Sequence, residues 1–178
     1  LINLVENLLS VTRIEEGRLN LHITEDLVDD VITEALHHVN RKSVEHPITV
    51  QHKEDYLLAK MDAKLMVQVV INIVDNAIKY TPKGSNILIK TWKQGDKAVI
   101  SIADDGDGIP EEMKERVFDM FYSGANKIAD SRRSLGLGLS LCRSIVNAHG
   151  GKITVSDNTP HGTVFTITLS AGEVEIHE

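Results

Sequence analysis

Polar side chains that can hold a charged ligand recur along residues 62–80 at the spacing of one helix face. At about 100° per residue, the polar positions fall within an arc of roughly 100°, and the apolar positions point the other way. The polar residues are Gln68, Asn72, Asp75, Asn76 and Lys79, and the apolar ones are Met66, Val69, Val70, Ile73, Val74, Ala77 and Ile78. Amides, an acid and an amine at this spacing form either a binding surface or the solvated face of an ordinary amphipathic helix.

An acidic, glycine-bearing turn covers residues 104–110, which read Asp-Asp-Gly-Asp-Gly-Ile-Pro. Glycine lets the backbone approach a ligand closely. The carboxylate of Asp104 could accept a hydrogen bond from an exocyclic amine such as that of adenine, and it would repel the carbonyl of guanine. The alternatives are a tight turn with a helix cap, or a calcium loop, and the latter lacks further oxygen ligands at EF-hand spacing.

A second pair of glycines, Gly136 and Gly138, opens an apolar helical segment in which Leu137 and Leu139 alternate with them. The free N–H groups and the positive end of such a helix suit a polyphosphate, and glycines permit its approach. Positive charge lies just upstream, at Lys127, Arg132 and Arg133. The pair matches neither the P-loop nor the dinucleotide fingerprint, and glycine also serves plain helix–sheet packing.

Helices and strands that alternate along the chain must position these motifs. Asp62 is suited to cap the helix that carries the polar stripe, and Pro82 ends it. The predicted helices are Asp26–His46, Asp62–Tyr80, Pro110–Met120 and Leu137–Ala148, and residues 122–134 read as a loop. The predicted strands are Leu19–Ile23, Ile48–His52, Tyr56–Met61, Ile87–Lys93, Ala98–Ala103, Lys152–Ser156 and Thr163–Leu169. Three main helices and a mostly antiparallel sheet predict an α+β fold, a two-layer α/β sandwich.

Residues 1–16 have apolar side chains every three or four positions, and Gly17 can end a helix there. That stripe can pack on the chain's own domain, or it can form part of a dimeric helix bundle. Because the pattern is already under way at Leu1, we expect the chain to be a piece of a longer protein.

Length and composition limit the remaining possibilities. The 178 residues suffice for one well-cored domain plus a short appendage. The net charge of −7 disfavours a nucleic-acid surface, which needs clustered Lys and Arg. The single cysteine, Cys142, lies in an apolar helical pattern and is expected to be a buried, reduced thiol. No apolar run approaches the roughly 20 residues that cross a bilayer.

Taken in order, the motifs resemble those of bacterial sensor histidine kinases. Residues 72–81 resemble the asparagine box, 104–108 the first glycine box and 118–121 the phenylalanine box. Residues 136–139 resemble the second glycine box and 162–165 the closing threonine motif. Residues 4–9 and 13–17 resemble the end of the second helix of the family's dimerisation and histidine-phosphotransfer bundle, which favours the bundle alternative. Residues 141–151 and 157–162 are most similar to the potassium-responsive KdpD-type kinases.

The resemblance implies the Bergerat ATP-binding fold shared with gyrase, Hsp90 and MutL. It divides the chain into a bundle-helix remnant (1–17), an ATP-binding catalytic domain (18–172) and a C-terminal tail (173–178). It implies Mg²⁺ held by Asn76, phosphates faced by Asn72 and Lys79, and the adenine amine held by Asp104 with help from Thr163. The other residues implied at the nucleotide are Tyr80, Gly106, Gly108, Ile109, Lys127, Arg132, Arg133, Gly136, Leu137, Gly138 and Leu139. Phe118 and Phe121 are expected to anchor a lid through apolar contacts.

Two departures from the wider superfamily bear on the reaction. ATP-hydrolysing relatives have a general-base glutamate where this chain has Asn72, and an amide cannot take a proton from water. The family's phosphoacceptor histidine is missing; His37, His38, His46, His52 and His149 lack its context and are expected to be structural or surface residues. The resemblance therefore implies a kinase domain that transfers the ATP γ-phosphate to a histidine outside these residues. The alternatives are a degenerate nucleotide-binding regulatory module and an ATPase clamp.

The resemblance also implies partners and a location. The intact protein is expected to be a homodimer that passes its phosphate to a response regulator. These residues would be a cytoplasmic domain of a bacterial inner-membrane sensor.

Overall fold

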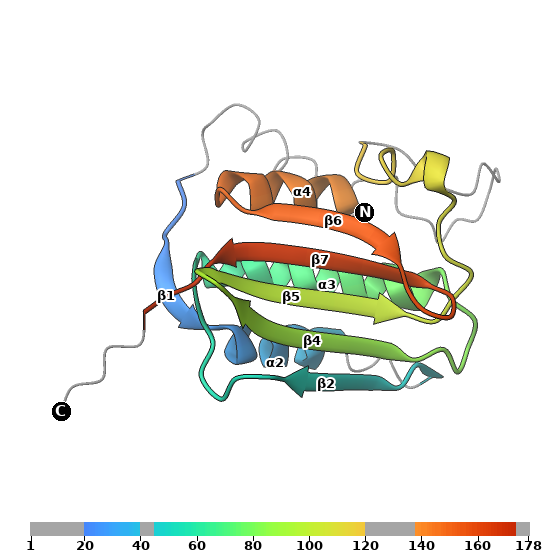
Figure 1. Ribbon diagram of the computed structural model, residues 1–178, viewed down its shortest axis with the longest axis horizontal. Helices are drawn as coiled ribbons and strands as arrows, with labels where there is room; N and C mark the ends of the chain where they lie inside the picture. The colour runs from blue at the N-terminus through green and yellow to red at the C-terminus, as the bar shows by residue number, and fades with distance from the viewer. Residues whose placement is uncertain (1–19, 40–44, 120–137, 174–178) are drawn as a thin grey trace.

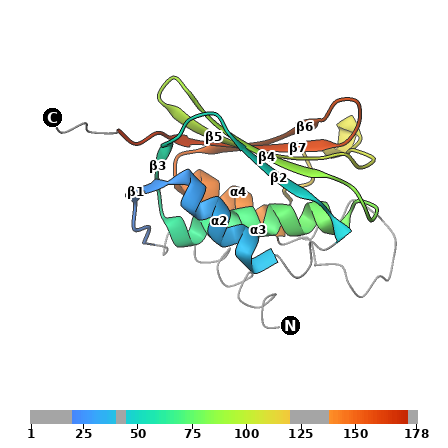
Figure 2. The same ribbon diagram turned by 90° about the horizontal axis from the view of Figure 1, so that it is seen from below.

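The computed structural model describes residues 20–39, 45–119 and 138–173, and within them the chain forms two layers. A five-stranded sheet forms one layer, and the helices α2, α3 and α4 cover one of its faces (Figures 1 and 2). In chain order the elements are β1 (Thr24–Leu27), α2 (Val28–Val39), β2 (Ile48–His52), β3 (Leu58–Met61), α3 (Ala63–Lys79), β4 (Ile87–Gln94), β5 (Lys97–Asp104), the 3₁₀-helix η2 (Glu111–Met113), α4 (Gly138–Ala148), β6 (Lys152–Asp157) and β7 (Thr163–Ser170). This confirms the predicted two-layer α+β class.

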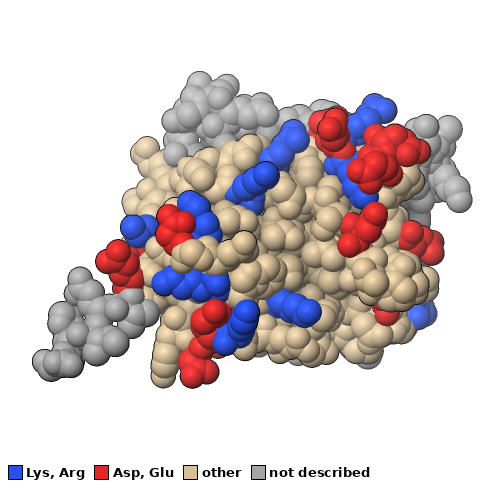
Figure 3. Space-filling view, viewed as in Figure 1, with Lys and Arg blue, Asp and Glu red and all other residues tan. Residues whose placement is uncertain are grey.

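The order of the main sheet is β2-β4-β5-β7-β6. β4, β5, β7 and β6 pair antiparallel, whereas β2 pairs parallel with β4. β1 and β3 form a separate two-stranded antiparallel ribbon. On the outer face of the sheet, basic side chains spread over the strands while acidic side chains gather mainly towards its ends (Figure 3).

Helix α3 lies in the middle of the helical layer and packs against both α2 and α4. The apolar face predicted from its sequence is the one that it buries. Met66, Val69, Val70, Ile73 and Val74 are each 0% exposed. Because this face is fixed against the sheet, the polar stripe on its other side is fixed in orientation as well.

The N-terminus of α3 is held by hydrogen bonds on every side. Oδ1 of Asp62 accepts from the N–H of Leu65 at 3.4 Å, and Oδ2 accepts from the N–H of His22 at 3.1 Å. The N–H of Asp62 donates to Nε2 of His149 at 3.0 Å, so Nδ1 of that ring carries the proton and donates to the carbonyl of Ile145 at 2.7 Å. The predicted cap at Asp62 is confirmed, and His149 has a structural role, linking the end of α4 to the start of α3.

Cys142 lies between the same two helices. Its side chain is 0% exposed and donates to the carbonyl of Val69 at 3.6 Å. Burial raises the pKa of this thiol to about 12. The buried, reduced thiol expected from the sequence is confirmed.

Several predicted boundaries are wrong, each because tertiary contacts decide them. The first strand is Thr24–Leu27 and not Leu19–Ile23, since residues 24–27 are the ones that pair with β3. Helix α2 begins at Val28 and ends at Val39, and His46 lies in a bend, buried. β3 begins at Leu58, two residues later than the predicted Tyr56.

The helix predicted over Pro110–Met120 is also wrong. The chain forms the short η2 and then turns as far as Phe118. The apolar residues of this segment join the hydrophobic core without a regular helix. The neighbouring residues Val117 and Phe118 are both buried, at 8% and 6% exposed, and Phe118 meets Phe165 edge to face with ring centroids 6.0 Å apart.

Candidate functional site

Asp104 ends β5 and is buried, with 9% of its surface exposed. Its Oδ1 accepts two backbone hydrogen bonds, from Gly106 at 3.0 Å and from Thr163 at 3.2 Å. Within the residues that the structure describes, Oδ2 accepts none. The arrangement leaves one carboxylate oxygen able to accept a hydrogen bond from a ligand.

Two opposing effects set the charge of this carboxyl group. Burial raises its pKa above the ordinary value, and the negative charge of Asp105 raises it further. The two N–H donors on Oδ1 stabilise the ionised form and lower the pKa, so they offset part of the cost of burial. A ligand donor that reached Oδ2 would also stabilise the ionised form and lower the pKa of Asp104.

The loop between β6 and β7 supports this turn from one side. The side-chain amide of Asn158 donates to the carbonyl of Asp104 at 2.8 Å, and Nδ1 of His161 lies 3.0 Å from the carbonyl of Gly106. Gly162 comes so close that a Cβ there would lie 2.0 Å from the carbonyl oxygen of Asp104. Its φ of +115° is also one that side-chain-bearing residues rarely adopt.

Asn86 supports the turn from the other side. Its N–H donates to Oδ1 of Asp105 at 2.8 Å, and its side-chain amide donates to Oδ2 at 3.1 Å. Asn86, Asn158 and His161 were not predicted as site residues. The sequence placed residues 158–162 only between two predicted strands, and nothing local indicated what they would contact.

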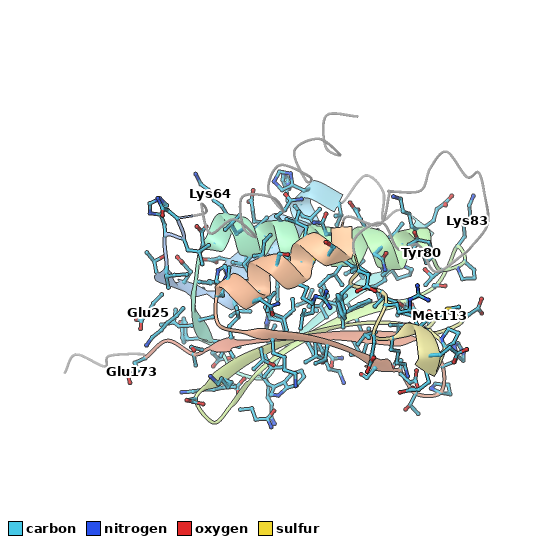
Figure 4. All side chains as sticks on the ribbon, turned by 90° about the horizontal axis from the view of Figure 1, so that it is seen from above. Glu25, Lys64, Tyr80, Lys83, Met113 and Glu173 are labelled. Carbon is cyan, nitrogen blue, oxygen red and sulfur yellow. The ribbon has the colours of Figure 1, made fainter. Side chains whose placement is uncertain are left out.

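Helix α3 presents its polar stripe on a partly exposed surface. Asn72 and Asn76 are partly buried, whereas Lys79 and Tyr80 are exposed. Nε2 of Gln68 donates to Oδ1 of Asn72 at 3.4 Å. The C-terminal end of the helix meets the acidic turn, because a Cβ on Gly106 would lie 2.7 Å from the methyl carbon of Thr81. Tyr80, beside it, lies at the same end of the molecule as Met113 (Figure 4).

The structure therefore brings together Asp104, Gly106 and Thr163, with Gly108 and Ile109 following in the same turn, beside the residues that end α3. Gly108 approaches Gly162, since a Cβ on Gly108 would lie 3.2 Å from the carbonyl oxygen of Gly162. Thr163 reaches Asp104 through its backbone N–H. Gly138 and Leu139 form the first turn of α4. Lys127, Arg132, Arg133, Gly136, Leu137 and Phe121 lie outside the described residues.

The described residues could hold a magnesium ion only together with nucleotide phosphates and water. Among the described residues, no group of three or more His, Cys, Asp or Glu side chains could hold a metal. Mg²⁺ is commonly bound through one or two protein oxygens together with substrate phosphates and water. The amide oxygen of Asn76, on the partly exposed stripe, is compatible with that mode.

Known proteins resemble the chain over the region that carries this site. The family model described as histidine kinase-, DNA gyrase B- and HSP90-like ATPase matches residues 61–173. The sensor protein KdpD of Clostridium acetobutylicum is 42% identical over 169 residues, which cover 95% of this chain and 19% of that protein. The chain thus spans about a fifth of that relative's length.

Solved structures agree. The catalytic domain of histidine kinase ThkA, in a nucleotide-free form, has a TM-score of 0.74 and 30% identity, over 84% of this chain and 95% of that one. ThkA in complex with the response regulator protein TrrA has a TM-score of 0.74 and 28% identity, over 95% of this chain and 48% of that one. No helix in the described ranges has the length and apolar character to span a membrane.

The sequence and the fold of the chain both show that it belongs to the histidine kinase-, DNA gyrase B- and HSP90-like ATPase family, as an ATP-binding catalytic domain of the sensor histidine kinase type.

Proposed function

We propose that this chain binds Mg-ATP with the adenine amine on Oδ2 of Asp104 and presents the γ-phosphate for transfer to a histidine. The observation that carries the proposal is that both backbone hydrogen bonds to the Asp104 carboxylate fall on Oδ1. Two backbone donors hold Oδ1 in a turn that contacts Thr81, just beyond the C-terminal end of α3, and Oδ2 is left for a ligand. A buried carboxylate with one open oxygen favours adenine, which offers a donor, over guanine, which offers an acceptor.

The polar stripe supplies groups for the triphosphate. Asn72 and Lys79 would donate to phosphate oxygens, and Asn76 would bind Mg²⁺, whose charge screens the phosphates. Tyr80, Gly108, Ile109 and the first turn of α4 would line the nucleotide. The basic residues Lys127, Arg132 and Arg133 with Gly136 and Leu137 would complete the phosphate side.

The same stripe favours phosphoryl transfer over hydrolysis. Asn72 stands four residues before Asn76, and its amide cannot act as a general base towards water. An imidazole acceptor is already nucleophilic, so transfer to it needs mainly positioning and neutralisation of charge. The chain would then supply binding and orientation, while the acceptor histidine comes from a bundle.

We assign residues 1–17 to the end of that bundle's second helix, 18–172 to the catalytic domain and 173–178 to a tail. The identity to KdpD favours a KdpD-type sensor kinase for the whole protein, and the ThkA complex with TrrA favours a response regulator as the final phosphate acceptor. The whole protein would be a homodimer with this domain on the cytoplasmic side of the inner membrane.

Mixing the chain with a separately produced bundle that carries the acceptor histidine tests the proposal. With labelled ATP and Mg²⁺, we expect acid-labile label on the bundle and little release of free phosphate when the bundle is omitted. Tight ATP binding without transfer would instead favour a regulatory module. Steady ATP turnover in the absence of the bundle would favour an ATPase clamp.

A further inference from the structure

Thr81 lies between the end of α3 and the acidic turn, and nothing above gives it a role. Building on the proposed function, we infer that Thr81 is a positioning residue for adenine recognition, which fixes Gly106 and through it Asp104, and that His46 holds Thr81 in place. The inference concerns two side chains that do not touch the nucleotide themselves.

The Thr81 side chain has both of its polar contacts satisfied. Its hydroxyl donates to the carbonyl of Ala77, in the last turn of α3, at 2.6 Å. Since that bond uses the only hydroxyl proton, Nε2 of His46, 3.0 Å from the same oxygen, must be the donor of the second bond. Two bonds in different directions fix the side-chain rotamer, and the methyl group is thereby aimed at Gly106.

Gly106 connects this methyl group to the recognition atom. A Cβ on Gly106 would lie 2.7 Å from Cγ2 of Thr81, so the two residues are in contact without room for a side chain between them. The N–H of Gly106 is one of the two donors to Oδ1 of Asp104. A shift of Gly106 would therefore lengthen that bond and turn the carboxylate, which changes the direction in which Oδ2 points.

His46 is built into the fold as a support. It is 4% exposed, and within the described residues its Nδ1 has no hydrogen-bond partner. Burying a polar nitrogen without a partner costs free energy. The favourable polar contact of this ring is the hydrogen bond from Nε2 to the Thr81 hydroxyl. The residue before it is anchored too, because the N–H of Gly84 donates to the carbonyl of Glu45 at 2.7 Å.

The same pair of residue types occurs elsewhere in the chain and provides a matched control. Nδ1 of His52 lies 2.8 Å from the hydroxyl oxygen of Thr91, which is 2% exposed in β4. No contact joins this pair to the acidic turn within the described part of the chain. Thr91→Ser removes one methyl group from a threonine that contacts a histidine, as Thr81→Ser does, but at a place where only folding stability can respond.

The experiment measures ATP affinity by calorimetry and folding stability by thermal melting for Thr81→Ser, Thr81→Val and Thr91→Ser. Thr81→Ser keeps the hydroxyl and loses the methyl group, and Thr81→Val does the reverse. We expect both Thr81 variants to bind ATP roughly 3- to 10-fold more weakly, the range that corresponds to one ordinary hydrogen bond. Thr91→Ser should keep wild-type affinity. Should Thr81→Val fail to fold, Thr81→Ser and His46→Gln carry the test.

The pH profile separates positioning from general destabilisation. Loosening the Gly106 donor removes a bond that stabilises the carboxylate, so the pKa of Asp104 rises and ATP binding is lost at a higher pH in Thr81→Ser than in wild type. Asp105 and Asp107 on the turn, His161 from the β6–β7 loop and His46 are the other ionisable side chains around this site. A parallel titration of Asp104→Asn measures their share.

A double-mutant cycle tests the contact itself. Gly106→Ala adds a methyl group that collides with Thr81, and Thr81→Ser removes the atom it meets, so the loss of ATP affinity in the double variant should be smaller than the product of the two single losses. The inference is overturned if the two single fold-losses of ATP affinity simply multiply in the double variant. It is also overturned if the Thr81 variants keep wild-type affinity and pH profile. Failure of the wild-type chain to bind ATP would instead overturn the proposed function.

Discussion

Two aspartates flank helix α3, and they use their oxygens differently. At the N-terminal end, each oxygen of Asp62 accepts one backbone N–H. Near the C-terminal end, Asp104 takes both of its backbone bonds on Oδ1. The residue type and the kind of donor are the same in both places. Both oxygens of Asp62 are engaged in holding the fold, whereas Oδ2 of Asp104 has no donor among the described residues and can accept one from a ligand.

The surroundings differ in the same sense. A histidine ring, His149, closes the Asp62 end. Around Asp104 the backbone of Gly106 and Gly162 comes so close that neither residue has room for a side chain. The first end should therefore respond to mutation through folding stability, and the second through ligand affinity, except where a substitution creates a steric clash.

Gly162→Ala should have the largest effect, because the new methyl group would clash with the backbone of Asp104. Its Cβ would lie 2.0 Å from the carbonyl oxygen of Asp104 at a φ of +115°. We expect the free energy of unfolding to fall by about 2–5 kcal/mol, from overpacking and backbone strain together. Chemical denaturation measures it. Gly84→Ala is the control, since its φ of +87° is strained but nothing lies within 4 Å of its Cβ. Equal losses in the two variants would contradict the collision.

Asp104→Asn should remove recognition and leave the fold in place. The amide oxygen can still accept from Gly106 and Thr163, but an NH₂ group that takes the place of Oδ2 faces the adenine amine as a second donor. We expect ATP binding to weaken by about 1.5–3 kcal/mol, the value of a hydrogen bond to a charged group. Calorimetry measures the affinity and a thermal melt the stability. Unchanged affinity would reject the adenine contact.

Asp62→Ala should lower folding stability and leave ATP affinity nearly unchanged, the reverse of Asp104→Asn. Loss of an N-cap costs about 0.5–2 kcal/mol of stability. We expect a lower melting temperature, with ATP affinity close to wild type at temperatures where the variant is folded. Asp62→Asn, which can still cap, should recover most of the loss. A strong loss of ATP affinity in the folded Asp62→Ala variant would mean that the two ends are coupled.

Acidification should have the smallest effect, and its effect on ATP binding is expected to come mainly through Asp104. The pKa of Asp104 is raised, and the ionised form is the one that accepts from adenine. ATP binding is thus complete above this pKa and declines as the pH falls through it, at a higher pH than an ordinary aspartate would give. ATP itself also titrates in acid, so wild type is compared with Asp104→Asn by calorimetry at each pH. Identical profiles would show that Asp104 does not titrate in binding.

The sequence predicted what depends on local pattern. The bounds of α3 followed from the cap at Asp62, the breaker at Pro82 and the apolar period between them. The role of Asp104, inferred from its place in the glycine turn, stays a prediction. The region 110–119 was predicted wrongly, because a polar segment with Pro110 at its start resembles a helix start. Only its contacts in the fold, such as Phe118 on Phe165, reveal otherwise.

The supports of Asp104 could not be predicted from the sequence. Asn86, Asn158 and His161 lie 18, 54 and 57 positions from Asp104 in the sequence and reach the acidic turn only through the pairing of β4, β5, β6 and β7. Thr163 was predicted as a partner of Asp104, but which of its atoms would donate depended on backbone geometry. The assignments of Lys127, Arg132, Arg133 and Gly136 remain predictions.

Cys142 gives the chain a built-in reporter of its own opening. Because the thiol is the only one in the sequence and is fully buried between α3 and α4, a thiol-reactive dye can modify it only when those helices separate. The labelling rate under native conditions would measure how often that happens. A nucleotide that binds along α3 should slow the labelling, so one unmodified protein could report both its ligand occupancy and the frequency of its local unfolding.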